Sequence, residues 1–131
     1  MSVEQNYIMI KEVFFFDSYA IVEIIKGSEN YLKYANAIII ITKLNLFEVY
    51  YGILRESTEC DADKFLVEYK KYVIGYDENV IREAARLKLE YRKRNVSMTD
   101  CIGYCIAQKW GVKFLTGDKE FEKMENVEFV K

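Results

Sequence analysis

The stretch Val13-Phe14-Phe15-Phe16-Asp17 decides how the rest of the chain is interpreted. Four bulky apolar residues in an unbroken run are typical of a strand buried on both faces, as in the middle of a parallel sheet. Asp17 follows at the carboxyl end of that strand, which is where open α/β sheets place their ligands. The sequence therefore predicts a central strand that delivers a carboxylate to a site.

Strands and helices alternate along the rest of the chain, which indicates βαβ units with right-handed crossovers. The predicted fold class is α/β, a three-layer α/β/α arrangement with a central parallel sheet of four to five strands. We expect strands near 12–16, 37–41, 72–74, 112–115 and 127–130, and helices near 18–26, 29–35, 43–56, 60–71, 78–94, 98–110 and 119–124.

The composition fits one domain over residues 1–131, with 1–11 as a loose lead-in whose Tyr7–Ile10 segment could extend or flank the first strand. The net charge of −2 gives no bulk attraction for nucleic acid, so phosphate contacts would be local or bridged by a cation. Neither a membrane-spanning run nor a signal peptide is recognisable. Three cysteines without a secretion signal point to a reducing cytoplasm.

The chain contains no histidine. This excludes Ser-His-Asp and Cys-His nucleophile systems, and it excludes most catalytic zinc sites, which depend on imidazole ligands. Cys101 and Cys105 lie one helical turn apart, but only Cys60 remains as a further thiol ligand, so the pair is interpreted as small core residues. Any chemistry must then use carboxylates, amines, hydroxyls or thiols, with or without a hard metal ion.

Three aspartates occupy positions that helix capping alone would explain. Asp17 precedes a predicted helix, Asp100 is the third helical residue of the capping-box pattern that begins at Ser97, and Asp118 follows Thr116-Gly117 before a short helix. Glu48 is different, because it lies among apolar residues one turn after a buried strand. A carboxylate there must reach the edge of the core or have a partner.

Taken together, the four acids have a second interpretation. Asp17 and Asp118 follow strands, while Glu48 and Asp100 lie near the beginnings of helices that follow such ends. In a parallel sheet all four face the same edge. Converging carboxylates raise one another's pKa, and a divalent cation relieves that repulsion. An all-oxygen ligand set favours Mg²⁺ or Mn²⁺ over zinc.

In this order and setting, the acids resemble those of the PIN-domain family of nucleases, and among them the small VapC-type toxins. The resemblance rests on FFFDSYAIVEIIKG, on the E-x-x-x-G of FEVYYG, and on SMTDCIGYCIAQKWGVKFLTGDKEF. It implies a metal site formed by Asp17, Glu48, Asp100 and Asp118. It also implies metal-dependent cleavage of RNA by a homodimer that an antitoxin protein holds inactive. Thr116 and Glu120 match accessory positions of the site.

Several cations are candidates for binding the RNA backbone, although a solvated helix face explains most of them equally well. They are Arg82, Arg86, Arg92 and Lys93 on or after the helix at 78–94, and Lys113 and Lys119 around the Thr-Gly-Asp turn. The predicted helix at 43–56 carries Leu44, Phe47, Tyr51 and Leu54 at a helical period, and Gly52 would let another backbone approach closely. Its tyrosines are interpreted as core or dimer interface.

Two alternatives to a nuclease remain at this point. A receiver-like phosphoacceptor domain is also a small doubly wound sheet, but it requires paired acids after the first strand and a lysine-containing loop after the fifth. Asp17 is single, and no such loop follows 127–130. A non-catalytic PIN-like module that binds RNA or protein is the stronger alternative. The presence of all four acids favours the enzyme.

Overall fold

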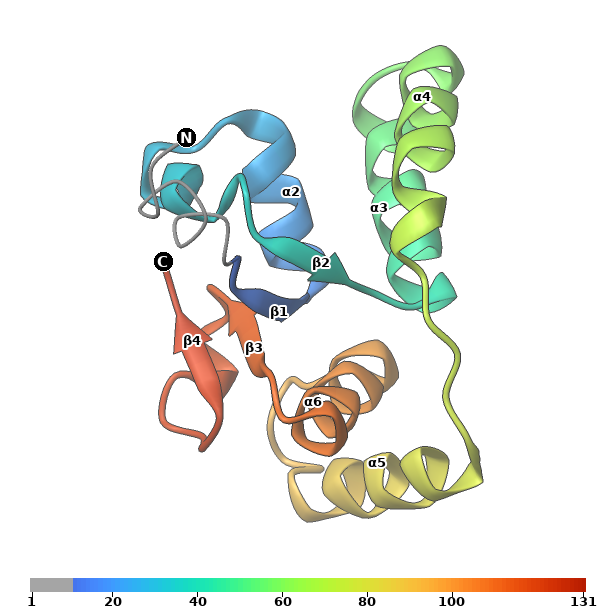
Figure 1. Cartoon of the computed structure of the whole chain (residues 1–131). Helices are drawn as coiled ribbons and strands as arrows, with labels where there is room; N and C mark the ends of the chain where they lie inside the picture. The colour runs from blue at the N-terminus through green and yellow to red at the C-terminus, as the bar shows by residue number, and fades with distance from the viewer. Residues whose placement is uncertain (1–10) are drawn as a thin grey trace, which may run out of the picture.

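The structure is a computed structural model that describes residues 11–131. Four strands form one sheet in the order β2-β1-β3-β4, and every neighbouring pair is parallel (Figure 1). The three-layer α/β/α fold with a parallel sheet of four strands is therefore confirmed. The strands are β1 (Val13–Phe16), β2 (Ile38–Ile40), β3 (Lys113–Thr116) and β4 (Val127–Phe129).

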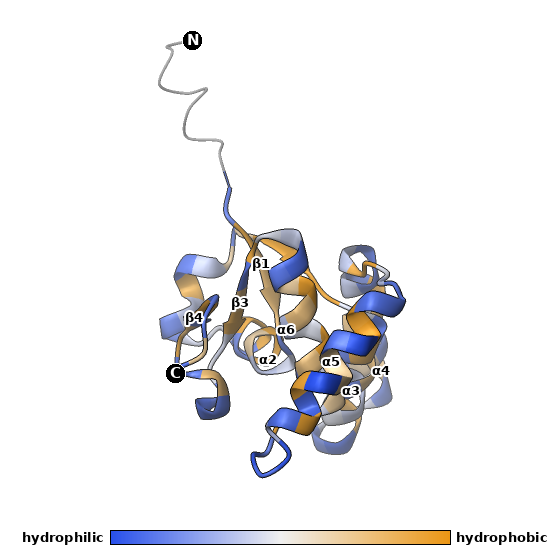
Figure 2. Cartoon of the chain, turned by 90° about the horizontal axis from the view of Figure 1, so that it is seen from below, coloured by the Kyte–Doolittle hydropathy of each residue, from blue (hydrophilic) through white to orange (hydrophobic). Residues whose placement is uncertain are grey.

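Strand β1 lies between β2 and β3, as its unbroken apolar run predicts. Its side chains alternate between the two faces of the sheet, and each face has its own core. Phe15 packs with Phe114 in one core, while Phe14 and Phe16 belong to the other. Figure 2 shows apolar residues along β1 and on parts of the helices around the sheet.

Helices cover both faces of the sheet (Figure 1). Helices α5 and α6 pack on the Phe15 side, and α2 with the 3₁₀ helix η1 packs on the other; α3 and α4 form a hairpin beyond β2. The helices are α2 (Ser18–Lys26), η1 (Glu29–Tyr34), α3 (Lys43–Glu56), α4 (Glu59–Tyr69), η2 (Lys70–Tyr72), α5 (Glu78–Glu90), α6 (Met98–Trp110) and η3 (Lys119–Phe121).

Several local expectations differ from the structure. The strand expected at 72–74 is a 3₁₀ turn followed by a single parallel bridge between Ile41 and Val73. Helix α5 ends at Glu90 rather than near residue 94, because Tyr91 at its C-cap leaves the helical backbone conformation. The proposed role of Tyr7–Ile10 beside the first strand lies outside the described residues.

Helix α3 differs most from its expected packing. Phe47, Tyr51 and Leu54, which share the helical period, are 70%, 53% and 43% exposed. The residues that α3 buries are Asn45, Leu46 and Val49. Apart from the neighbouring backbone of α3, no atom of residues 11–131 lies within 4 Å of where a β-carbon on Gly52 would be, so no other described segment makes the close backbone approach predicted there.

Candidate metal centre

The three aspartates meet at the carboxyl end of the sheet. Asp17 follows β1, Asp118 follows β3, and Asp100 belongs to the first turn of α6. All three line one open hollow, together with Tyr19, Gly117, Lys119 and Lys131. The convergence predicted from the sequence is thus observed for these three acids.

Asp17 is the most deeply placed of the acids, with a relative exposure of 2%. Its Oδ1 accepts a hydrogen bond of 2.8 Å from the Ala20 backbone N–H, so it caps α2 as the simpler interpretation proposed. Its Oδ2 accepts a hydrogen bond from the Thr116 hydroxyl. The fully buried Thr116 Oγ1 in turn accepts one from the Asp118 backbone N–H at 3.0 Å. One hydroxyl therefore joins the two acids that follow the strands.

Asp100 and Asp118 also cap helices while they face the hollow. Asp100 Oδ2 accepts from the Ser97 N–H at 3.0 Å, and Ser97 Oγ accepts from the Asp100 N–H, which completes the expected capping box. Asp118 Oδ1 accepts from the Glu120 N–H at 3.0 Å. Capping and site formation are therefore compatible, because each carboxylate uses one oxygen for a cap and leaves the other available.

Glu48 is held beside this hollow by a separate set of contacts. The Ser18 hydroxyl donates to Glu48 Oε1 at 2.7 Å, and the Asn45 side-chain amide donates to Ser18 Oγ at 3.1 Å. Glu48 lines the neighbouring hollow between α2 and α3 rather than the one that contains the three aspartates. It has the partner that its apolar surroundings required, and it is close enough to raise the pKa of Asp100.

The electrostatics of the site disfavour the charged forms of Asp17 and Asp100. Burial raises the pKa of Asp17 to about 8; the hydrogen bonds from Thr116 and Ala20 oppose this rise, and the charges of Asp100 and Asp118 add to it. Burial also raises the pKa of Asp100, with smaller contributions from Glu48 and Asp118. A bound cation would reverse this tendency by favouring the ionised carboxylates.

The residues fit a hard divalent cation by donor type, since carboxylate oxygens are the ligands that Mg²⁺ and Mn²⁺ prefer. Within residues 11–131, no three acidic or thiol side chains are gathered closely enough to hold an ion unaided. Mg²⁺ is commonly bound by one or two carboxylates with water completing its shell, so an incomplete protein shell does not disqualify the site.

The accessory residues differ in their relation to the hollow. Thr116 lies between two of the acids, whereas Glu120 points to Arg94, whose Nε is 3.1 Å from Glu120 Oε1. Lys119 lines the hollow. Lys113 opens β3, at the end of the strand away from Asp118, so a role in the same site requires a long substrate.

The cations of α5 are spread along the helix rather than gathered at the acids. The start of α5 lies beside the end of α6, because Lys109 Nζ is 2.8 Å from Asp77 Oδ2. Arg82 is therefore remote from Asp100, and it pairs with Glu78 at 3.2 Å. Arg92 and Lys93 are exposed and follow the C-terminal end of α5, next to Arg94, which pairs with Glu120. Arg86 lies within α5, between Arg82 and this C-terminal end.

Sequence reasoning missed several residues at the site. Asn45, 1% exposed, could have been found from its place three residues after Thr42, where it completes a capping box. Ser18, Tyr19 and Lys131 carry no local signal, because their contacts join segments far apart in the chain. Arg94 also carries no local signal, although it alone of Arg92, Lys93 and Arg94 forms an ion pair within residues 11–131.

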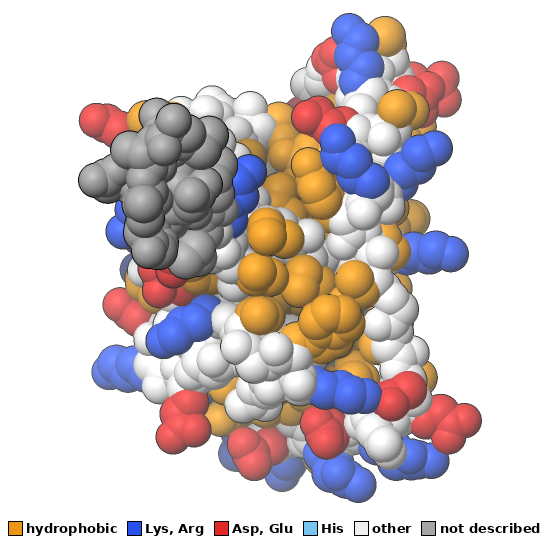
Figure 3. Space-filling view, in the orientation of Figure 1, with side chains coloured by type: hydrophobic (Ala, Val, Ile, Leu, Met, Phe, Trp, Pro, Cys, Tyr) orange, Lys and Arg blue, Asp and Glu red, His pale blue; other side chains and the backbone are white. Residues whose placement is uncertain are grey.

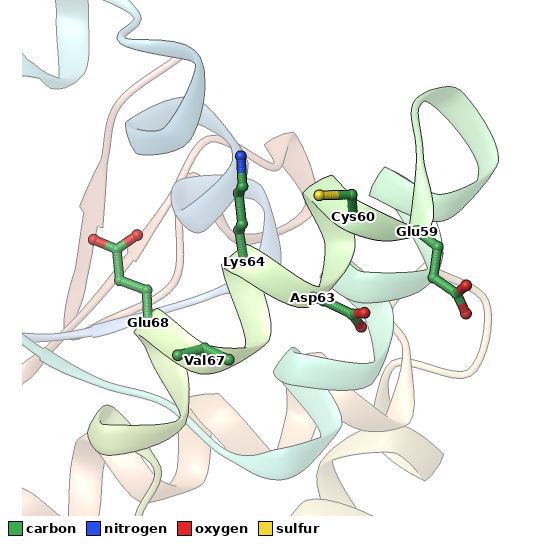
Figure 4. Close-up of a pocket in the computed structure, with 6 residues that line it drawn as sticks. All are labelled: Glu59, Cys60, Asp63, Lys64, Val67 and Glu68. Carbon is green, nitrogen blue, oxygen red and sulfur yellow. The ribbon is translucent and has the colours of Figure 1, made fainter.

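A further hollow lies on the surface of α4, but its polar side chains do not point toward one another (Figure 4). Glu59 and Asp63 point to one side of the helix, while Cys60 and Lys64 point to another. Cys60 is an exposed free thiol, and Cys101 and Cys105 are buried in the core, as expected. The aspartates at the carboxyl end of the sheet therefore remain the candidate site.

Comparisons with known proteins agree with this architecture. The family model of the PIN domain matches residues 14–127. The chain is similar in structure to a toxin–antitoxin complex from Klebsiella pneumoniae, with a TM-score of 0.67 and 19% identity over 87% of this chain and 94% of the other. No protein in the curated collection matches it.

Two further solved structures have the same fold. VapBC2 from Rickettsia felis, bound to a DNA fragment from its promoter, has a TM-score of 0.66 and 17% identity over 91% of this chain and 99% of the other. The sarcin–ricin loop cleaving toxin VapC20 of Mycobacterium tuberculosis has a TM-score of 0.68 and 14% identity over 90% and 99%. These likenesses establish the fold, and the family model spans both strands that carry site aspartates. The chain therefore belongs to the PIN-domain family.

Proposed function

We propose that this protein is a metal-dependent endoribonuclease and the toxin of a toxin–antitoxin pair. The observation that carries the proposal is the meeting of Asp17, Asp100 and Asp118 in one hollow at the carboxyl end of the parallel sheet. Membership of the PIN-domain family supports nuclease chemistry, and the similar solved structures described as toxins support the biological role.

In this proposal the three aspartates hold Mg²⁺ or Mn²⁺, and Glu48 contributes from the side. The bound ion would lower the pKa of a water molecule and neutralise charge on the scissile phosphate. Thr116 keeps Asp17 and Asp118 in place through its shared hydroxyl, and Ser18 orients Glu48. Glu48, the one acid of the four that does not hold the ion in this proposal, would accept a proton from the attacking water.

RNA is the proposed substrate, and Lys119, Arg92 and Lys93 are proposed to contact it. Lys119 lines the hollow, and the exposed Arg92 and Lys93 follow α5. Because the chain has a net charge of −2, these local cations and the metal ion must offset the repulsion between the acids and the RNA backbone. Among the similar structures, one is described as a sarcin–ricin loop cleaving toxin.

The exposed apolar surface of α3 supports an antitoxin partner and a homodimer. Phe47 and Tyr51 stack with their ring centroids 6.3 Å apart on the outside of α3. Figure 3 shows further apolar side chains gathered over the β2 edge of the sheet, where Ile38 is 48% exposed. Exposed apolar patches of this kind mark interaction sites. The hollow between α2 and α3 would admit an apolar segment of the antitoxin.

The proposed place of action is the cytoplasm, where the three free thiols would remain reduced. Among the helices formed by residues 11–131, none combines the length and apolarity needed to cross a bilayer.

The direct test is cleavage of a mixed pool of structured and single-stranded RNA. Purified protein and Asp100→Asn would each be incubated with Mn²⁺, Mg²⁺ or a chelator. We expect cleavage that requires the metal ion and is lost in the variant. The products should carry 5′-phosphate and 3′-hydroxyl ends, because a metal-activated water does not need the 2′-hydroxyl. Cyclic phosphate ends would contradict this mechanism, and RNA binding without cleavage would favour a non-catalytic module.

A further inference from the structure

The hollow that contains the three aspartates also contains a cation to which the mechanism gives no role. This cation is Lys131, which lines the hollow from the segment after β4. Every other lining residue comes from β1–α2, α6 or the loop after β3. We propose that Lys131 binds a phosphate of the RNA backbone beside the scissile one and so positions the substrate. This inference rests on the proposed function and adds a substrate-positioning residue to it.

The backbone that carries Lys131 is held in place by three hydrogen bonds. The Val130 N–H donates to the Thr116 carbonyl at 2.9 Å, which extends the contact between β4 and β3. The Tyr31 hydroxyl donates to the Val130 carbonyl at 2.7 Å, and the Asn30 side-chain amide donates to the Lys131 carbonyl at 3.2 Å. Two residues of η1 therefore fix the end of this segment next to the residue that bridges Asp17 and Asp118.

The side chain of Lys131 is positioned as well. Its Nζ lies 5.7 Å from the centroid of the Tyr19 ring, within the range of a cation–π contact. Tyr19 in turn packs directly on Gly117, where a β-carbon would come within 2.1 Å of Tyr19 Cε1 and 2.5 Å of the Val130 carbonyl oxygen. Tyr19, Gly117 and residues 130–131 thus form one continuous wall of the hollow.

Lys131 is available for an anion, unlike several other cations. Arg94 is paired with Glu120, Arg82 with Glu78 and Lys109 with Asp77. Lys131 takes part in none of the ion pairs formed within residues 11–131. A polyanion that approaches three carboxylates requires positive charge on the wall of the hollow, and an ammonium held at its edge provides a point contact to phosphate.

The test compares Lys131→Met with Lys131→Arg, and it uses Lys123→Met as the control because Lys123 is an exposed lysine outside the hollow. For Lys131→Met we expect KM for RNA to rise about tenfold with kcat unchanged, because the variant loses one hydrogen bond to a charged group. The slope of log KM against log salt concentration should become shallower by about 0.7, the value for one phosphate of a single strand. Lys131→Arg should remain close to wild type.

A second variant tests the positioning contacts. Tyr31→Phe removes the hydroxyl that holds the Val130 carbonyl, so it should raise KM by a smaller factor than Lys131→Met. Combined with Lys131→Met it should add nothing, because it acts through the lysine. A merely structural role for Tyr31 would instead give independent, additive effects.

The inference and the proposed function fail in different ways. If wild type cleaves RNA with metal, but Lys131→Met and Lys123→Met share its KM and salt dependence, the inference is overturned and the proposed function stands. If wild type does not cleave, fluorescence anisotropy with the same RNA replaces KM, and the loss of affinity and of salt slope in Lys131→Met alone would still support the phosphate contact. Absence of both cleavage and binding in wild type overturns both.

Discussion

Helices α6 and α3 both begin with a capping box, and both carry a site acid near the N-terminus, but their surroundings differ. Helix α6 buries eight of its thirteen residues, whereas α3 buries three of fourteen. Asp100 therefore projects from a helix that belongs to the core, while Glu48 projects from a helix with one face open. Helix α6 therefore holds its acid within the core, and the open face of α3 is the surface that the proposed partner would bind.

The largest effect on the rate of RNA cleavage should come from replacing the acids on these two helices by their amides. We expect Asp100→Asn to lower the rate of RNA cleavage at least about 100-fold, because it removes a charge from the hollow that would hold the metal ion. Glu48→Gln should lower the same rate only about tenfold, since a glutamine oxygen can still accept the hydrogen bond from Ser18. Initial rates at saturating Mn²⁺ measure both. A greater loss at Glu48 would place the centre of the site on α3 instead.

A matched pair of glycines tests the difference in packing between α6 and α3. A β-carbon at Gly103 of α6 would lie 2.5 Å from Phe15 Cε1, whereas at Gly52 of α3 it would meet no described residue outside the adjacent helix backbone within 4 Å. Gly103→Ala should lower the free energy of unfolding by about 1–3 kcal/mol through overpacking. Gly52→Ala should leave it unchanged or raise it by up to about 1 kcal/mol through helix propensity. Urea titrations of the metal-free proteins measure both, and equal effects would refute the contrast.

The pH dependence of stability tests Asp17, the buried acid that follows β1. Because burial raises the pKa of Asp17 from 3.8 to about 8, the folded state holds this proton over a range in which the unfolded state has lost it. The stability of the metal-free protein should therefore fall as the pH rises from about 4 to 8. Asp17→Asn should remove this part of the fall. Thermal unfolding in chelator at several pH values measures it, and parallel curves for the two proteins would contradict the assignment.

The smallest effect on stability should come from the open face of α3. Phe47→Ser with Tyr51→Ser removes two side chains that are already 70% and 53% exposed. The free energy of unfolding should change by only about 0.5 kcal/mol. Self-association or antitoxin binding, followed by light scattering, should weaken much more. A large loss of stability without any change in association would show that this face serves the fold of the chain alone.

The same contrast explains what the sequence could predict. The central strand, the alternation of elements and the bounds of α3 and α6 follow from apolar runs and capping residues that are visible locally. The buried face of α3 does not, because its first turns have apolar residues on all sides and the polar Asn45 is buried by bonds to Thr42 and Ser18. The 3₁₀ form of η1 and the bridge at Val73 depend on tertiary contacts in the same way.

At the site, local patterns located the acids but not their surroundings. Each aspartate is recognisable because it follows a strand or opens a helix. The separation of Glu48 from the shared hollow could not be predicted, because it depends on a hydrogen bond to Ser18, thirty positions away in the sequence. The approach of Lys131 to Tyr19 depends on how β4 and η1 meet, and no pattern within either segment records it.

The measurement that tests the central claim most directly is calorimetric titration of Mn²⁺ into metal-free wild type and Asp17→Asn, with thermal unfolding of the same samples. The account predicts saturable binding and a rise in melting temperature for wild type, and the loss of both in the variant, because Asp17 lies at the base of the acidic hollow. Identical titrations and unchanged melting temperatures in the two proteins would contradict a metal centre at this position.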